Sequence, residues 1–279
     1  MKLSHLFLLA ALALSSLAQA SPADLANMVK AEYDFADMAK REGYKASFLE
    51  YLSEDSVMFE NGAVPARKRV SARPEMQGSL RWYPSYAVVS SAGDMGLSTG
   101  PWVYWDKGKP AGFGHFVSIW RKQADGSWRN ALDVGVNHDE LKPAPEQLKV
   151  AAPSGHADSM SAAARGDRSS DIRAAEAQFA QLASTAGYAA ATEQLAKSAL
   201  RVYRDGHPPI TGTEAAMTIL KDKDAVAPPR LDYAAGSGDF GYAYGLIAKS
   251  QFVHVWQQEN GKWQLLADIL LPLPEPKPQ

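Results

Sequence analysis

Two glutamates lie inside apolar stripes of predicted helices, where a carboxylate is at least partly removed from water. Glu32 and Glu176 have these apolar neighbours at helical spacing: Val29, Phe35, Ala36, Ile172, Phe179 and Ala180. Burial raises the pKa of a carboxyl group, so each glutamate is a candidate general base or ligand anchor. The alternative is a structural carboxylate that accepts hydrogen bonds where a helix meets a sheet. The recurrence of the feature favours that structural role.

Asp133 and His115 are the other acid–base candidates, because Asp133 closes a predicted strand and His115 lies within one. Each has a plainer alternative: a strand-end aspartate paired with a neighbouring segment, and a strand histidine that is exposed or satisfied by hydrogen bonds. The sequence contains no His-Glu-x-x-His motif and no glycine-rich phosphate or dinucleotide loop. We therefore expect neither a metal nor a cofactor.

Aromatic side chains are dense in the first half of the chain. A wall of aromatic residues with few polar groups is typical of a pocket for an apolar ligand. The candidate ligand-binding residues are Trp82, Tyr86, Trp102, Trp105 and Trp120. The alternative is that these rings pack within a sheet or at an interface.

The overall composition excludes several classes of partner and site. The chain has 279 residues, with 29 Lys plus Arg against 31 Asp plus Glu, so its formal net charge is -2. Without a basic excess, neither nucleic acid nor an anionic membrane is an expected partner. The absence of cysteine excludes thiol nucleophiles, disulfides and Cys-ligated metal sites.

Residues 1–20 have the pattern of a cleavable signal peptide. Lys2 precedes an apolar run over 6–14, and small residues lead to a cleavage site after Ala20. The apolar run is far shorter than the roughly 20 residues that span a bilayer. We therefore expect an exported protein, periplasmic or secreted, with no membrane span.

The chain repeats itself. The pattern around Glu32 returns around Glu176, shifted by 144 residues, and the Gly-Asp-x-Gly turn at 93–96 returns at 238–241. Further matched pairs are Trp120 with Trp256, Trp128 with Trp263, and Asp133 with Asp268. Ordered matches of this kind predict two related copies. Their predicted boundaries are 22–140 for copy one, 141–166 for a linker, 167–272 for copy two and 273–279 for a proline-rich tail.

Each copy begins with predicted helices and continues with predicted strands. Apolar residues recur at helical spacing from Ala23 onward, and Gly43 and Gly187 stand where the first helix of each copy should stop. The period then changes to two, and Gly-Asp and Asp-Gly turns separate the strands. The sequence therefore predicts an α+β protein with two tandem domains, each with N-terminal helices packed on a curved antiparallel sheet.

This pattern resembles the nuclear-transport-factor-2-like superfamily, specifically its SnoaL-like branch. The residues that carry the resemblance in copy one are 32–36, Gly43, 93–96, Trp120, 126–128 and Asp133, and those in copy two are 176–180, Gly187, 238–241, Trp256, 261–263 and Asp268. The resemblance implies a cone, in which a curved sheet wraps around the helices and leaves an apolar pocket at its open end, where Asp133 would face the mouth. Members include cofactor-free isomerases, dehydratases and cyclases as well as non-catalytic binding modules, so the fold leaves the function open.

Three functions fit these observations. The leading interpretation is an exported protein that binds a small apolar molecule in the cone of copy one, with no proven catalysis. The second is a cofactor-free lyase, isomerase or cyclase that uses Glu32, Asp133 or His115. The third is a non-catalytic scaffold in which the two copies pack as an intrachain pseudo-dimer. Convergence of the three acid–base side chains in a cavity lined by Trp82 or Trp102 would favour the enzyme, whereas filled cones would favour the scaffold.

Overall fold

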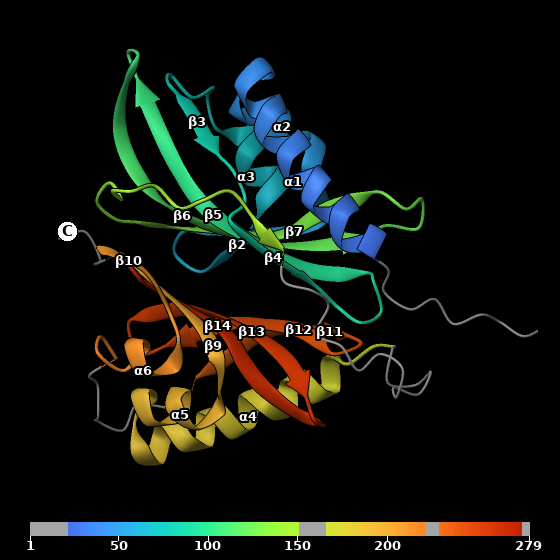
Figure 1. Cartoon of the computed structure of the whole chain (residues 1–279), viewed down its shortest axis with the longest axis vertical. Coiled ribbons are helices and arrows are strands. Elements are labelled where there is room, and N and C mark those ends of the chain that lie inside the picture. The colour runs from blue at the N-terminus through green and yellow to red at the C-terminus, as the bar shows by residue number, and fades with distance from the viewer. Residues whose placement is uncertain (1–21, 151–165, 221–228, 275–279) are drawn as a thin grey trace, which may run out of the picture.

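The computed structural model describes residues 22–150, 166–220 and 229–274. Helices lie at the two ends of the molecule, and two sheets face each other between them (Figure 1). The predicted signal peptide, most of the predicted linker and the last residues of the predicted tail lie outside the described residues, so those assignments stay predictions. Within the described ranges, no helix is long and apolar enough to cross a membrane.

Both copies follow the same order of elements, with helices first and a meander of long strands afterwards. Copy one consists of α1 (Pro22–Glu42), α2 (Tyr44–Tyr51), β1 (Leu52–Phe59), β2 (Ala63–Pro65), α3 (Ala66–Ala72), β3 (Ser79–Trp82), β4 (Tyr86–Val89), β5 (Met95–Asp106), β6 (Lys109–Lys122), β7 (Trp128–Asn137) and β8 (Lys149–Val150). Copy two consists of α4 (Ser169–Ala186), α5 (Tyr188–Leu195), β9 (Ala196–Arg204), β10 (His207–Thr211), α6 (Thr213–Ala216), β11 (Arg230–Ser237), β12 (Phe240–Ile247), β13 (Ser250–Glu259) and β14 (Lys262–Pro272).

A glycine ends the first helix of each copy, as predicted. Gly43 and Gly187 have φ angles of 93° and 90°, a region that side chains with a Cβ rarely adopt. In each copy the chain therefore turns sharply and starts a second helix with a tyrosine, Tyr44 or Tyr188. These two tyrosines occupy equivalent positions at the interior of their copies.

The prediction of two tandem α+β domains is confirmed, but the sheets are mixed rather than purely antiparallel. The strand orders are β2-β1-β7-β6-β5-β4-β8, with β3 also paired to β5, and β10-β9-β14-β13-β12-β11. The last long strand of each meander returns beside the strand that follows the helices and runs parallel to it, β7 to β1 and β14 to β9. The short β8 lies within the predicted linker and pairs with β4.

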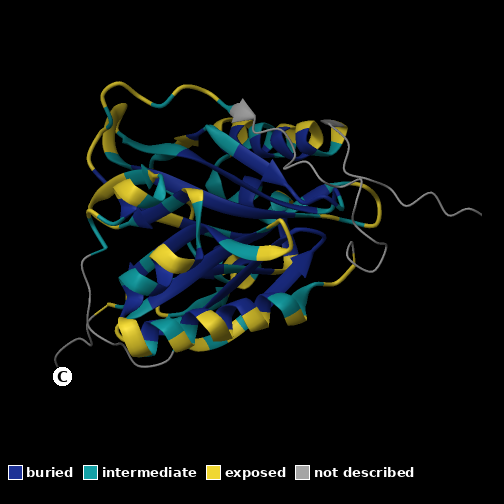
Figure 2. Cartoon of the chain, turned by 60° about the horizontal axis from the view of Figure 1, so that its bottom comes forward, coloured by how far each residue is buried: buried dark blue, intermediate teal, exposed yellow. Residues whose placement is uncertain are grey.

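The inner face of each sheet packs on its own helices. In copy one, the apolar face of α1, including Met28 and Phe35, meets Trp120 of β6. In copy two, Phe179 of α4 meets Trp256 of β13. Figure 2 shows buried strands at the centre of the molecule and exposed residues on the outer faces of the helices. Each copy therefore has a core of its own.

The outer faces of the two sheets pack on each other. This shared core includes Leu97, Val117 and Ile119 from the first sheet and Phe240, Val253 and Val255 from the second. Reciprocal polar contacts border it: Ser237 Oγ donates to Asp94 Oδ2 at 2.7 Å, and the backbone N–H of Ser91 donates to Asp239 Oδ1 at 2.6 Å. Because Asp94 and Asp239 are matched positions of the repeat, the packing has the character of a two-fold interface within one chain.

We predict that the protein is a monomer in solution. Each sheet already covers the apolar face of the other, so neither leaves that face for a second chain. Light scattering at micromolar concentration should give the mass of one chain. A stable dimer would contradict this use of the two sheets.

Candidate functional site

The buried carboxylate of α1 is bound to three strands. Glu32 is fully buried and accepts hydrogen bonds from Trp82 Nε1 in β3 at 2.7 Å, Ser98 Oγ in β5 at 2.6 Å and Trp120 Nε1 in β6 at 2.9 Å. Burial raises the pKa of Glu32 to about 7, although the three donors favour the charged form. Glu32 thus fixes the position of two indole rings relative to the helix.

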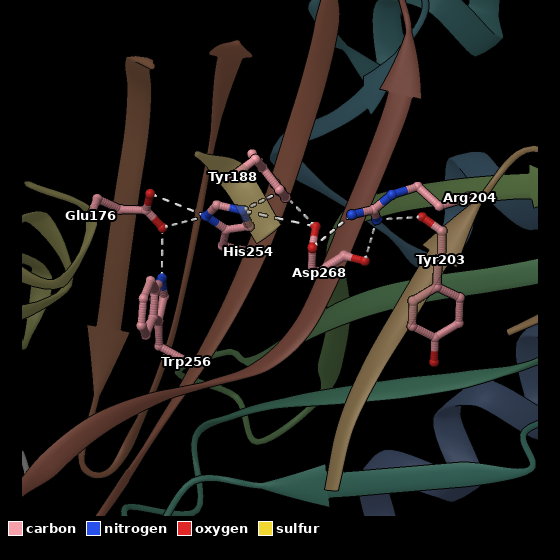
Figure 3. A network of polar contacts seen from close by, with 7 residues as sticks. All are labelled: Glu176, Tyr188, Tyr203, Arg204, His254, Trp256 and Asp268. Carbon is pink, nitrogen blue, oxygen red and sulfur yellow. Dashed lines mark hydrogen bonds and ion pairs between the residues drawn. The ribbon is translucent and has the colours of Figure 1, made fainter. Parts of the chain in front are cut away.

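The corresponding carboxylate of copy two begins a longer network (Figure 3). Glu176 accepts a hydrogen bond from Trp256 Nε1 at 2.6 Å and lies 3.0 Å from His254 Nδ1. His254 Nε2 lies 3.0 Å from the Tyr188 hydroxyl, which donates to Asp268 Oδ1 at 2.8 Å. A continuous row of buried polar groups therefore crosses the interior of copy two from α4 to β14.

Arg204 of β9 ends this network. Its Nη2 donates to Asp268 Oδ2 at 2.7 Å, and its Nη1 donates to the Asp268 backbone oxygen at 2.9 Å. Burial acts to raise the pKa of Asp268, but the Arg204 guanidinium and the other partners outweigh it, so the pKa lies below its ordinary value. The buried aspartate of copy two therefore has a charge partner inside the protein.

Asp133 is the equivalent aspartate of copy one. It pairs with Met58 across β7 and β1, just as Asp268 pairs with Val202 across β14 and β9. Its Oδ2 accepts hydrogen bonds from Ser118 Oγ at 2.9 Å and Asn130 Nδ2 at 3.2 Å. Burial raises the pKa of Asp133 to about 6, and these neutral donors offset only part of that effect.

A cavity of about 210 Å³ opens beside Asp133 at the mouth of the first cone. Its lining consists of Phe35, Tyr44, Phe48, Leu80, Trp82, Trp102, Phe116, Asp133 and Gly135. Asp133 carries the only formal charge in this described lining. The cavity is thus an aromatic enclosure with one carboxylate.

Trp102 forms one wall because the neighbouring strands carry glycine. A Cβ atom on Gly114 of β6 would lie 2.3 Å from the Trp102 ring and 2.0 Å from the Val136 backbone oxygen. Gly135 of β7 lies against the same ring. The indole therefore rests on backbone rather than on side chains, which keeps the space above the sheet open.

Tyr44 is a site residue that sequence analysis missed. Burial, and secondarily the charge of Asp133, raise the pKa of Tyr44 to about 12, so its hydroxyl keeps its proton at neutral pH. The signal was present in the sequence, since Tyr44 follows Gly43 as Tyr188 follows Gly187. Only the structure reveals that both tyrosines lie near the aspartate of the last strand.

The other candidate aromatic residues lie in different surroundings. Trp82 and Trp102 line the cavity, whereas Trp120 is fully buried behind it. Trp105 borders an adjacent hollow of about 280 Å³, which shares Trp82 and Trp102 with the cavity, and the Arg81 guanidinium lies 4.7 Å from the centre of the Trp105 ring. Tyr86 lies at the contact between the two copies, where the Arg201 guanidinium is 3.7 Å from its ring centre. Their part in ligand binding stays a prediction.

Glu32, Asp133 and His115 do not converge in one cavity, which is the arrangement that would have favoured the enzyme interpretation. His115 lies on the outer face of β6, where its Nδ1 is 2.7 Å from His138 Nε2, because side chains alternate between the faces of a strand. Burial lowers the pKa of His115 to about 3, so it is neutral at physiological pH. Glu32 lies behind Trp82 and does not line the cavity. Of these three residues, Asp133 alone lines the cavity.

Copy two has a hollow of about 420 Å³ at its open end. Its inner wall includes Tyr188 and Arg204, which both bind Asp268, so these groups separate the hollow from the interior of the cone. Residues 221–228, which follow Leu220 in the wall of the hollow, lie outside the described residues. The two copies thus differ in what occupies the space beside the last-strand aspartate.

No protein-family model and no curated protein sequence matches the chain. Similar solved structures include an NTF-2-like protein of unknown function from Shewanella oneidensis MR-1, with 16% identity and a TM-score of 0.34 over 41% of this chain and 98% of that one. A ketosteroid isomerase-like protein from Erwinia carotovora atroseptica SCRI1043 has 16% identity and a TM-score of 0.32 over 42% and 98%. A domain of unknown function with a cystatin-like fold from Nostoc punctiforme PCC 73102 has 14% identity and a TM-score of 0.37 over 44% and 82%. The resemblance to NTF2-like proteins therefore concerns the fold of about one copy, and not an activity.

We predict that Glu32→Gln changes the pH dependence of stability. The pKa of Glu32 is about 7 in the folded protein against an ordinary value of 4.5, so the folded state binds the proton more tightly. This contribution is fully present below pH 4.5 and is lost as the pH rises through 7. Between pH 4.5 and 8 the free energy of unfolding of the wild type should fall by roughly 3 kcal/mol relative to Glu32→Gln. Chemical denaturation at several pH values measures this difference. If the free energy of unfolding changes equally with pH in both proteins, the result contradicts the raised pKa of Glu32.

We predict that Arg204→Met destabilises the protein by about 3–5 kcal/mol, because it leaves the buried Asp268 without its cation. Glu60 occupies the equivalent position in copy one and forms half-exposed ion pairs with Arg69 and Arg73. Glu60→Gln is therefore the matched control, with an expected cost below about 1 kcal/mol. Urea denaturation of both variants tests the difference, and equal costs would show that Asp268 does not depend on Arg204.

Proposed function

We propose that copy one binds a small, mainly apolar molecule in the cavity beside Asp133. The single observation that carries this proposal is the enclosure itself, in which aromatic rings surround one carboxylate. Such a lining matches the usual chemistry of ligand pockets, where a few polar groups orient a molecule held by apolar contacts.

The size of the cavity limits the ligand. Drug-sized molecules occupy pockets of about 300–1,000 Å³, whereas an apolar cavity of about 150 Å³ accepts benzene. A volume of about 210 Å³ therefore suits a molecule with one ring or two small rings. Trp82 and Trp102 offer flat surfaces for stacking such a ring.

Copy two has a structural role in this proposal. Tyr188, His254, Asp268 and Arg204 bind one another in the interior that copy one leaves open. The outer face of the sheet in copy two covers the outer face of the sheet in copy one, as a second subunit would. The scaffold interpretation thus applies to copy two and not to the whole chain.

We also propose that the protein is exported, on the signal-peptide pattern of residues 1–20.

A second candidate function is cofactor-free proton transfer of the isomerase, dehydratase or cyclase type. The observation that favours it is that Asp133 and Tyr44 share one cavity. With its pKa raised to about 6, Asp133 is largely ionised at neutral pH and more basic than an ordinary aspartate, while the Tyr44 hydroxyl can donate a hydrogen bond to developing negative charge.

Tryptophan fluorescence tests the binding proposal, because two indoles line the cavity. Titration with one-ring and two-ring compounds such as phenol, indole and 2-naphthol should give saturable changes in emission. Trp102→Ala should weaken binding by about tenfold or more, since it removes a wall of the site. Trp263→Phe, which changes an indole of copy two, should leave the affinity unchanged. Absence of saturable change with every compound would contradict the proposal, as would full affinity in Trp102→Ala.

A further inference from the structure

The two copies differ in the charge next to the last-strand aspartate. In copy two, Arg204 lies two residues after Val202, the strand partner of Asp268. In copy one, the residue two positions after Met58, the strand partner of Asp133, is Glu60. The position that supplies a cation to Asp268 in copy two therefore carries an acidic residue in copy one.

No other described residue replaces that cation in copy one. The charged and titratable groups around Asp133 are Glu32 from α1 and Tyr44 from α2, with Arg73 beside Tyr44 at the end of α3. Arg73 is bound to Glu60. The direct partners of Asp133 are the neutral Ser118 and Asn130, and both bind Oδ2. Oδ1 is consequently the oxygen available to a molecule in the cavity.

The walls of the cavity favour a positive ligand as well. The faces of Phe, Tyr and Trp rings carry partial negative charge and attract cations, and this attraction is strongest where water is excluded. Six of the nine lining residues are Phe, Tyr or Trp. A neutral apolar ligand would cover the Asp133 carboxylate without compensating its charge, which costs free energy.

We infer that the ligand of copy one is a small organic cation, a ring-bearing ammonium whose N–H donates to Asp133 Oδ1 while its ring packs against the aromatic walls. This inference rests on the proposed binding function and names its ligand class. The ligand supplies to Asp133 the positive charge that Arg204 supplies to Asp268.

The test compares 2-phenylethylammonium with 2-phenylethanol, which has nearly the same size and shape but no charge. Isothermal titration calorimetry at pH 8 should show that the ammonium binds at least about tenfold more tightly. Asp133→Asn should abolish this preference, because it removes the negative charge that the ammonium compensates. Asp37→Asn, which removes one negative charge from the exposed side of α1, should keep the preference and serves as the matched control.

The pH dependence in the wild type tests the same inference without a variant, in case Asp133→Asn does not fold. Because the pKa of Asp133 is about 6 without ligand, the preference for the ammonium should shrink as the pH is lowered from 8 to 5. The ammonium group itself stays protonated over this range.

The outcomes separate the inference from the proposed function. Equal or tighter binding of the alcohol at pH 8 would overturn the organic cation while leaving the binding function in place. A preference that persists in a folded Asp133→Asn variant, or that does not change with pH, would also overturn it. Binding of neither compound, together with no response to the wider set of ring compounds, would instead contradict the binding function.

Discussion

The hydrogen bond between a buried helix carboxylate and a strand indole determines the interior of both copies. Glu32 binds Trp120 and Glu176 binds Trp256, in each case between the first helix and the same strand of the sheet. A buried carboxylate is stable only with such donors, so the helix has one acceptable position on the sheet. That position fixes which residues face the interior of each cone, including the aspartate of its last strand.

The copies differ in the other side chains that bind the helix glutamate. Copy one adds Trp82 and Ser98 as donors to Glu32, and the Trp82 ring becomes a wall of the cavity. Copy two adds His254, whose imidazole connects Glu176 to Tyr188 and Asp268. One set of partners leaves an open space, whereas the other fills it with side chains that bind one another. In copy one, the last-strand aspartate therefore lines an open cavity. In copy two, Tyr188 and Arg204 bind the equivalent aspartate.

The repeat in the sequence predicted much of this arrangement. Matching residues in the same order along the two halves of the chain identified the helix glutamates, the paired tryptophans, the last-strand aspartates and the glycines that end the first helices. These features depend on order along the chain, which the sequence contains directly. The α+β class followed from the change of period between helices and strands.

Other features could not be predicted because they depend on which strands become neighbours. Trp82 and Glu32 are 50 residues apart and meet only when β3 pairs with β5. The parallel pairing of β9 with β14 brings Arg204 to Asp268, and that pairing is absent from a predicted antiparallel meander. His115 was grouped with Glu32 and Asp133 by residue type, although its place on β6 directs it to the opposite face of the sheet.

A crystal structure of the protein grown with saturating 2-phenylethylammonium tests most directly whether copy one is the binding copy. We expect the ring between Trp82 and Trp102 and the ammonium nitrogen within hydrogen-bond distance of Asp133 Oδ1. In copy two we expect the contacts of Tyr188 and Arg204 with Asp268 to be unchanged. An empty cavity in copy one, with the ligand bound instead in the hollow beside Arg204, would contradict this division between the two copies.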